Sequence, residues 1–291
     1  MNAFLTRLLR LGLLLIFGIA IFALAPAVAQ NAETLTGTTD RSIQIRQITG
    51  NVSVGGKPAK VGEQLREGEK IITDSNSSAT LVVEDGIATL QLSESTQMQV
   101  QNLDTTTNNG KVTRVFASRG QVTAFTRKLI NPESRFEIAF RGDDEETEGG
   151  IAGSRGTVYG VAVGPNGKTG ISTKEGEVAV TAEEKTVLLG AGTSSLVFPG
   201  KPPTLPRTTS ENILLKVKLL SPSANQKVRV QAEVDPLNLV FLNGQAVEIG
   251  SDGKFDTVIA LSNNRSLSIV VRTPLGQQQV YELEAAGVNQ P

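Results

Sequence analysis

Residues 43 to 198 form short runs in which apolar and polar residues alternate, and glycine, asparagine, aspartate or serine separates one run from the next. In one run, Met98 and Val100 lie on one side while the flanking glutamines lie on the other. This period of two is typical of strands with one buried face, whereas an amphipathic helix repeats its apolar residues every three to four positions. Such helical spacing is missing after residue 30. The sequence therefore predicts an all-β fold.

One local pattern, a glycine followed by a polar residue and a valine, occurs at Gly50, Gly120 and Gly176. Each copy predicts a glycine turn that leads into a strand with one buried face. The intervals between the three copies are unequal, which argues against a solenoid of fixed repeat length. We expect stacked, β-helix-like sheets that use the same strand entry more than once.

A proline-rich stretch divides the chain. Its prolines predict an extended connector over residues 199–210. We therefore expect one domain over residues 43–198 and a second over 211–287. In the second, about seven short strands predict a small immunoglobulin-like sandwich, with two-residue hairpin turns at Asn243-Gly244 and Asp252-Gly253. The prolines are Pro199, Pro202, Pro203 and Pro206.

The first 29 residues have the three parts of a secretory signal peptide: Arg7 and Arg10, an uncharged stretch from Leu11 to Leu24, and Ala27-Val28-Ala29. We expect cleavage after Ala29, a flexible leader over 30–42, and a periplasmic or secreted bacterial protein. The alternative is an uncleaved anchor, because about 20 apolar residues can span a bilayer. In that case the segment would be the protein's only contact with the membrane.

Composition excludes several classes of chemistry. The chain has no histidine, cysteine or tryptophan, so it cannot form a serine–histidine triad, a cysteine–histidine pair, or a metal site built on imidazole or thiolate. Its 28 basic and 29 acidic residues nearly balance, which gives no general attraction to nucleic acid. We expect a protein that is not an enzyme, has no cofactor and binds no nucleic acid.

The segment from Ala162 to Thr169 contains a loose match to a phosphate-binding loop that ends in Gly167-Lys168-Thr169. That motif needs a helix directly after it, whose N-terminus binds the phosphates. Here a strand pattern follows, and Pro165-Asn166-Gly167 is a strong turn signal. The sequence predicts a β-hairpin and no nucleotide.

An acidic run contains the candidates for a metal site: Asp143, Asp144, Glu145 and Glu146. Calcium takes oxygen ligands, which such a run can supply. The regular ligand spacing and the central glycine of a helix-loop-helix calcium site are missing. A solvated charged loop is the favoured interpretation.

Many short elements between Gly50 and Gly192 together resemble the FecR domain, named after a regulator of ferric citrate transport. The stretch Ser154 to Val161 resembles that family's Val-Arg-Gly-Thr-x-Phe-x-Val signature, with Arg155, Gly156 and Thr157 at its centre. The other matching elements, in order, are Gly50-Asn51-Val52, Val61-Gly62 with Leu65, Gly68 to Thr73, Ala79-Thr80-Leu81 with Asp85-Gly86, Leu92 to Thr96, Gly120-Gln121-Val122, Phe136-Glu137-Ile138, Glu175 to Val178 and Leu189 to Gly192.

The resemblance implies an all-β periplasmic module, which in the iron regulators relays a signal from an outer-membrane transporter to a cytoplasmic sigma factor. Two features depart from those regulators: only ten residues precede the apolar stretch, and a proline-rich linker with a sandwich-like domain follows. What the resemblance implies here is the module without the sigma-regulating part. Arg155, Gly156 and Thr157 are then structural signature residues.

Taken together, these observations predict an exported, non-enzymatic binding or scaffolding protein of the bacterial cell envelope. Its expected partner is an envelope protein or cell-wall glycan. One alternative is an envelope sensor in iron or stress signalling that works with a separate membrane or sigma-regulating partner. Another is a hydrolase that cleaves cell-wall glycan with carboxylate side chains.

Overall fold

The computed structural model describes residues 41–142, 144, 146–210, 213–223, 227–262 and 266–284. In these ranges the chain forms β-strands and a single short 3-10 helix, Glu84–Gly86, which confirms the predicted all-β fold. The predicted signal peptide lies outside the described residues. Within them, no helix is long and apolar enough to cross a membrane.

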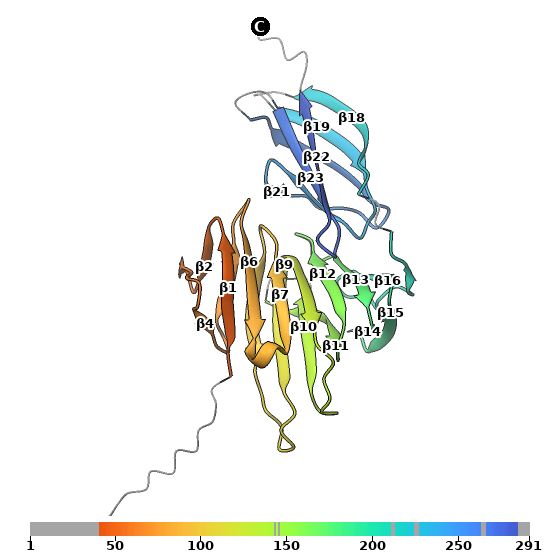
Figure 1. Ribbon diagram of the computed structural model, residues 1–291. Helices are drawn as coiled ribbons and strands as arrows, with labels where there is room; N and C mark the ends of the chain where they lie inside the picture. The colour runs from red at the N-terminus through yellow and green to blue at the C-terminus, as the bar shows by residue number, and fades with distance from the viewer. Residues whose placement is uncertain are drawn as a thin grey trace, which may run out of the picture. The chain divides into compact units, whose positions relative to one another are not determined.

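Seventeen strands build the first domain (Figure 1). They are β1 (Ile43–Thr49), β2 (Val52–Val54), β3 (Lys57–Pro58), β4 (Gln64–Leu65), β5 (Lys70–Thr73), β6 (Ser78–Val83), β7 (Ala88–Leu92), β8 (Gln97–Asn102), β9 (Val112–Thr126), β10 (Arg135–Arg141), β11 (Glu148–Ser154), β12 (Val158–Val163), β13 (Thr169–Glu175), β14 (Glu177–Ala182), β15 (Lys185–Gly190), β16 (Thr193–Val197) and β17 (Arg207–Thr208).

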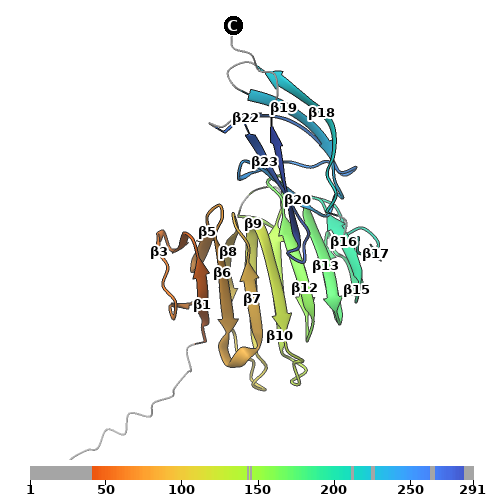
Figure 2. The same cartoon turned by 45° about the horizontal axis from the view of Figure 1, so that its top comes forward.

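These strands form two layers that share β9. Sheet A has the order β4-β1-β6-β7-β9-β12-β13-β16-β17, and sheet B has the order β3-β2-β5-β8-β9-β10-β11-β14-β15. Figures 1 and 2 show β1, β6 and β7 of sheet A side by side. Apolar residues from both sheets form one core. Among the pairs of named strands, only β9 with β10 is parallel, so the layers are stacked as expected but are not a parallel β-helix.

The long strand β9 changes sheets at Gly120. Its first half pairs with β8 and β10 in sheet B, and its second half pairs with β7 and β12 in sheet A. Gly120 has a φ of +85°, and a Cβ atom there would overlap Thr96. A glycine is therefore required where the strand bends from one layer to the other.

All three copies of the glycine–polar–valine pattern mark such crossings. Gly50 lies between β1 of sheet A and β2 of sheet B, and Gly176 lies between β13 of sheet A and β14 of sheet B. Hydroxyl groups stabilise two of the corners: the N–H of Asn51 donates to Ser77 Oγ at 2.9 Å, and the N–H of Gln121 donates to Thr96 Oγ1 at 3.0 Å. The sequence pattern thus identifies points where the chain changes layer.

The second domain is a smaller antiparallel sandwich, parts of which are labelled in Figure 2. A three-stranded sheet, β18-β19-β22, and a four-stranded sheet, β21-β20-β23-β24, enclose a separate apolar core. The strands are β18 (Lys216–Ser223), β19 (Lys227–Glu233), β20 (Leu239–Leu242), β21 (Gln245–Ala246), β22 (Lys254–Ala260), β23 (Ser266–Arg272) and β24 (Gln278–Glu284).

Of the two hairpin turns predicted in this domain, one is confirmed. Asn243-Gly244 joins β20 to β21, with Leu242 opposite Gln245 and positive φ angles at both turn residues. Asp252-Gly253 does form a turn, but it does not connect paired strands. The strand before it, β21, pairs with β20, whereas β22 after it pairs with β19 in the other sheet.

Two expected boundaries need correction. The predicted leader 30–42 extends too far, because Arg41 is 5% exposed and donates to Glu84 and to the carbonyl of Val112. The predicted extended linker 199–210 is partly a strand of the first domain, because β17 pairs with β16 and the N–H of Thr204 donates to the carbonyl of Leu196. Sequence-local signals missed both, since each depends on partners elsewhere in the fold.

Replacing Gly120 with alanine should strongly destabilise the first domain. Alanine at a φ of +85° carries a backbone penalty of about 1–2 kcal/mol. The overlap of its Cβ with Thr96 should add about 1–3 kcal/mol, because that backbone would have to move. Urea denaturation of the full chain measures the total.

Gly68→Ala is the matched control. Gly68 has the same φ of +85°, but no other atom lies within 4 Å of the place that a Cβ would occupy there. It should show only the backbone penalty. Equal losses of stability in the two variants would contradict the proposed role of the crowded corner.

Candidate functional site

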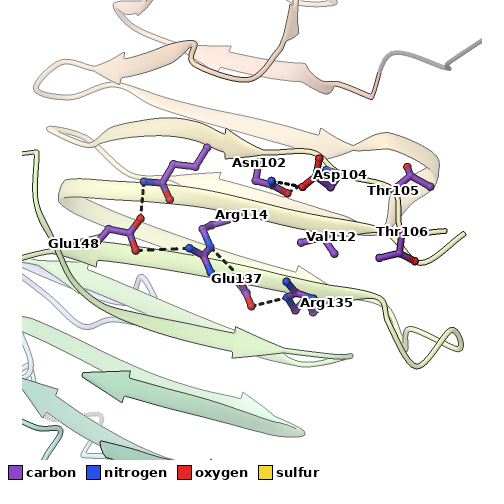
Figure 3. A pocket seen from close by; sticks show the side chains of 10 residues that line it. Asn102, Asp104, Thr105, Thr106, Val112, Arg114, Arg135, Glu137 and Glu148 are labelled. Carbon is purple, nitrogen blue, oxygen red and sulfur yellow. Dashed lines mark hydrogen bonds and ion pairs between the residues drawn. The ribbon is translucent and has the colours of Figure 1, made fainter. Parts of the chain in front are cut away.

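A polar groove of about 670 Å³ lies on sheet B, over β8, β9 and β10 (Figure 3). Five side chains form a continuous row of hydrogen bonds and ion pairs along it. Apart from Val112, every residue of its lining is polar or charged. The row consists of Gln101, Glu148, Arg114, Glu137 and Arg135.

Arg114 is the centre of this row. Its Nε donates to Glu137 Oε2 at 2.9 Å, and its Nη1 lies 3.8 Å from Glu148 Oε2. Gln101 donates to the other oxygen of Glu148 at 2.9 Å, and Arg135 donates to the other oxygen of Glu137 at 2.9 Å. Each carboxylate thus bridges two neighbours, which restricts the orientation of all five side chains.

This row is better suited to recognition than to stabilising the fold. The side chains of Arg114 and Arg135 are 31% and 50% exposed, and ion pairs at such positions add little to the free energy of unfolding. Whereas the side chain of Glu137 is only 13% exposed, the donors of both arginines remain accessible from solvent. A polar polymer, such as a glycan or an extended peptide, could form hydrogen bonds with them without prior rearrangement.

The three signature residues form the crossing from β11 in sheet B to β12 in sheet A. Thr157 is buried and donates its N–H to Thr126 Oγ1 at 2.7 Å, and Thr126 returns its own N–H to the carbonyl of Thr157 at 2.8 Å. Gly156 has a φ of +132° and lies against Lys128. Arg155 is exposed and donates to the carbonyl of Asn131 at 3.1 Å.

The signature crossing also borders a second hollow, of about 450 Å³. Arg135 and Glu137 line both this hollow and the groove. Its lining includes two small residues, Gly153 and Ala179. The two hollows, which share Arg135 and Glu137, together form one surface, polar in the groove and partly apolar in the second hollow, where Leu188 is exposed; we call it the sheet B surface.

The acidic run supports no metal centre in the part of the chain that the structure describes. Asp143 and Glu145 lie outside it. Asp144 accepts hydrogen bonds from the backbone of Glu146 and Thr147 at 2.9 and 2.8 Å. Hydrogen bonds from the side chain and backbone of Thr147 and from the backbone of Glu146 lower the pKa of Asp144. Among described residues, no three acidic side chains form a group that could hold a metal ion.

The phosphate-loop match is a β-hairpin, as predicted. Residues 164–168 connect β12 to β13, with the N–H of Gly164 donating to the carbonyl of Lys168 at 2.9 Å. Lys168 is only 1% exposed. Its ammonium group donates to the carbonyls of Pro236 and Asn238 in the second domain, at 2.6 and 3.1 Å. Lys168 therefore joins the domains, a role that the sequence did not suggest.

Other contacts complete this joint, which lies within the single compact unit that begins at Arg41. Arg272 of β23 forms an ion pair with Glu94, and both side chains are largely buried. Gln121 donates to the carbonyl of Pro274 at 3.0 Å. Gly160 and Gly170 allow backbone approach, since a Cβ at Gly160 would overlap Pro274, and one at Gly170 would lie 2.6 Å from the Leu237 carbonyl.

Sequence reasoning missed both the groove and the joint. The groove residues lie on four strands, and only the register of those strands brings them together. The available signal was the run of polar side chains at outward positions, such as Arg114 and Glu137, but the same pattern is expected of any solvated face. For Lys168, the glycine-rich context suggested a turn and carried no sign of burial.

Comparison with known proteins gives limited similarity. No protein-family model and no curated protein matches the chain. Two crystal structures described as a "putative anti-sigma factor" from Parabacteroides distasonis are similar to it, at 15% sequence identity and TM-scores of 0.39 and 0.38. Each similarity covers 48% of this chain and 60% of that chain. The resemblance to the FecR domain stays a prediction from the sequence.

Lys168 should make stability depend on pH. Burial lowers its pKa from 10.5 to about 7, although Asp235 partly opposes the shift. Between these two values the unfolded chain binds more protons than the folded chain, so the free energy of unfolding should rise with pH. The slope should reach at most about 1.4 kcal/mol per pH unit. As pH falls through about 7, this contribution is lost.

Urea denaturation of wild type and Lys168→Met between pH 7 and 9.5 measures this effect. The variant should lack the rise, because it has no group to titrate at that position. Lys174→Met, at an exposed position of the strand that follows, β13, should keep the wild-type slope. Parallel curves for wild type and Lys168→Met would show that Lys168 does not titrate in this range.

Proposed function

We propose that this chain is an exported, non-enzymatic binding or scaffolding protein of the bacterial cell envelope. In this proposal it combines a FecR-like domain with an immunoglobulin-like domain. The sheet B surface is its contact with a cell-wall glycan or an envelope protein. The observation that carries the proposal is the row of paired, solvent-accessible charges centred on Arg114.

The groove's chemistry favours a binding role over hydrolysis. A glycan hydrolase needs a carboxylic acid that holds a proton and a second carboxylate that does not. In the groove, Glu137 accepts hydrogen bonds from Arg114 and Arg135, and Glu148 accepts one from Gln101 and lies 3.8 Å from Arg114, so neither carboxylate is without a donor partner. The pair is suited to accepting hydrogen bonds from a ligand.

A scaffolding role is supported by the joint between the two domains. Two buried or largely buried side chains, Lys168 and Arg272, each bind partners across it. Opening the joint would break these contacts together with the hydrogen bond from Gln121 to Pro274, so the placement of the two domains is restricted. The second domain can then hold a second contact at a defined distance from the sheet B surface.

Arg114→Gln should weaken binding without changing the fold. We expect the full chain to sediment with isolated peptidoglycan sacculi or to crosslink to an envelope protein from a photoreactive residue at Thr105, which is exposed in the groove. The substitution should reduce this binding by at least about tenfold, which corresponds to about 1.4 kcal/mol. The melting temperature should stay within about 2 °C, because the ion pairs are partly exposed.

Arg229→Gln is the matched control. It removes an exposed ion pair with Asp256 from the second domain, with N–O distances of 2.6 and 2.8 Å. Binding should be unchanged in this variant. Equal binding by both variants would contradict the assignment of the sheet B surface. Release of soluble wall fragments would favour the hydrolase alternative, and crosslinking to a transporter or sigma regulator would favour the sensor alternative.

A further inference from the structure

A second cavity, separate from the sheet B surface, lies where the first domain meets the β20–β21 hairpin. Its volume is about 540 Å³, within the range of sites that hold small organic ligands, and such sites are frequent where domains meet. Corner residues of the first domain, including Ser75 and Ser95, line one side. Gly244 and Ala246 of the hairpin line the other. We call this cavity the joint cleft.

The base of the joint cleft is apolar. Val163 of β12 and Leu239 and Phe241 of β20 line it, and each is at most 3% exposed. Leu239 and Phe241 pack on Ala162 in a small apolar cluster that belongs to both domains. This base could receive an aliphatic or aromatic group of a ligand, because that group would then be removed from water.

Two arginines line the same cleft. Arg119 comes from β9, directly before the bend at Gly120, and Arg141 comes from the end of β10. Asp74 also lines the cleft, so two positive charges face one negative charge. Exposed Asp144 lies within electrostatic range of Arg141 as well. The cleft lining itself therefore carries a net positive charge.

One of these two arginines, Arg141, has a hydrogen-bond donor without an acceptor. The Nε of Arg141 is buried and has no hydrogen-bond partner among the described residues. A buried donor left unpaired is costly, and a guanidinium group forms its strongest hydrogen bonds with carboxylates and phosphates. The Nε itself is enclosed by protein, so an acidic ligand in the cleft would bind the terminal nitrogens of this guanidinium group.

The surrounding contacts restrict the shape of the cleft. Lys168, Gln121 and Arg272 hold the second domain against the first through buried polar contacts. Arg272 also lies over the ring of Phe241, 5.1 Å from its centroid. The apolar base and the arginines are thus in place before a ligand arrives, which lowers the entropy lost on binding.

We propose that the joint cleft binds a carboxylate carried by an apolar group, with Arg141 as its anionic contact and Phe241 in its apolar base. The two features point to the same ligand class, because a purely ionic ligand would leave the base unused and a purely apolar one would leave the Arg141 guanidinium group without an anionic partner in the cleft. This inference is independent of the sheet B surface.

NMR titration of the full chain with N-acetylphenylalanine tests the proposal. We expect saturable shifts of the backbone amide signals of Gly244 and Ser95, which line the cleft. N-acetylphenylalaninamide, which lacks the carboxylate, and N-acetylglycine, which lacks the aromatic group, should each bind at least about tenfold more weakly. This comparison needs no variant, so it does not depend on whether a substituted chain folds.

Arg141→Gln should weaken the binding of N-acetylphenylalanine by about tenfold or more and abolish its preference over the amide. Arg229→Gln, on the outer side of the second domain, should bind as wild type does. The proposal is overturned if N-acetylphenylalanine causes no saturable shifts, if acid and amide bind equally to wild type, or if Arg141→Gln retains wild-type affinity.

Discussion

Gly120 allows a single strand, β9, to belong to both layers of the first domain. Its positive φ and the contact with Thr96 place the bend where a side chain has no room. Because β9 pairs with β8 and β10 on one side of the bend and with β7 and β12 on the other, both sheets take their register from it. The common core between the sheets depends on that register.

The same register creates the surfaces on which the functional proposals rest. Arg114 lies opposite Glu137 because β9 and β10 pair in parallel before the bend. After the bend, β12 and β13 present Gly160 and Gly170 to the second domain, whose backbone approaches too closely to allow side chains there. The bend in β9 therefore positions both the polar groove on sheet B and the close-packed joint on sheet A.

Much of the fold could be predicted from local pattern. Alternation identified strands such as the one containing Met98 and Val100, and turn chemistry identified the hairpins at Pro165-Asn166-Gly167 and Asn243-Gly244. Predictions that depended on distant partners were less successful. The proline-rich segment, predicted only as an extended connector, pairs with β16, and Arg41 is anchored by residues more than forty positions away.

By itself, the sequence determined the all-β class, the turns, and the chemistry excluded by the absence of histidine and cysteine, because these follow from residue type and local spacing. It also marked the layer crossings by their glycines, because a backbone position with a positive φ favours glycine. Only the tertiary structure decided that Lys168 is buried in a joint, that Arg114 bridges two carboxylates, and that Arg119 and Arg141 line one cleft. The physical reason is that burial and pairing depend on strand register and domain contact, and both join residues that are far apart in the chain.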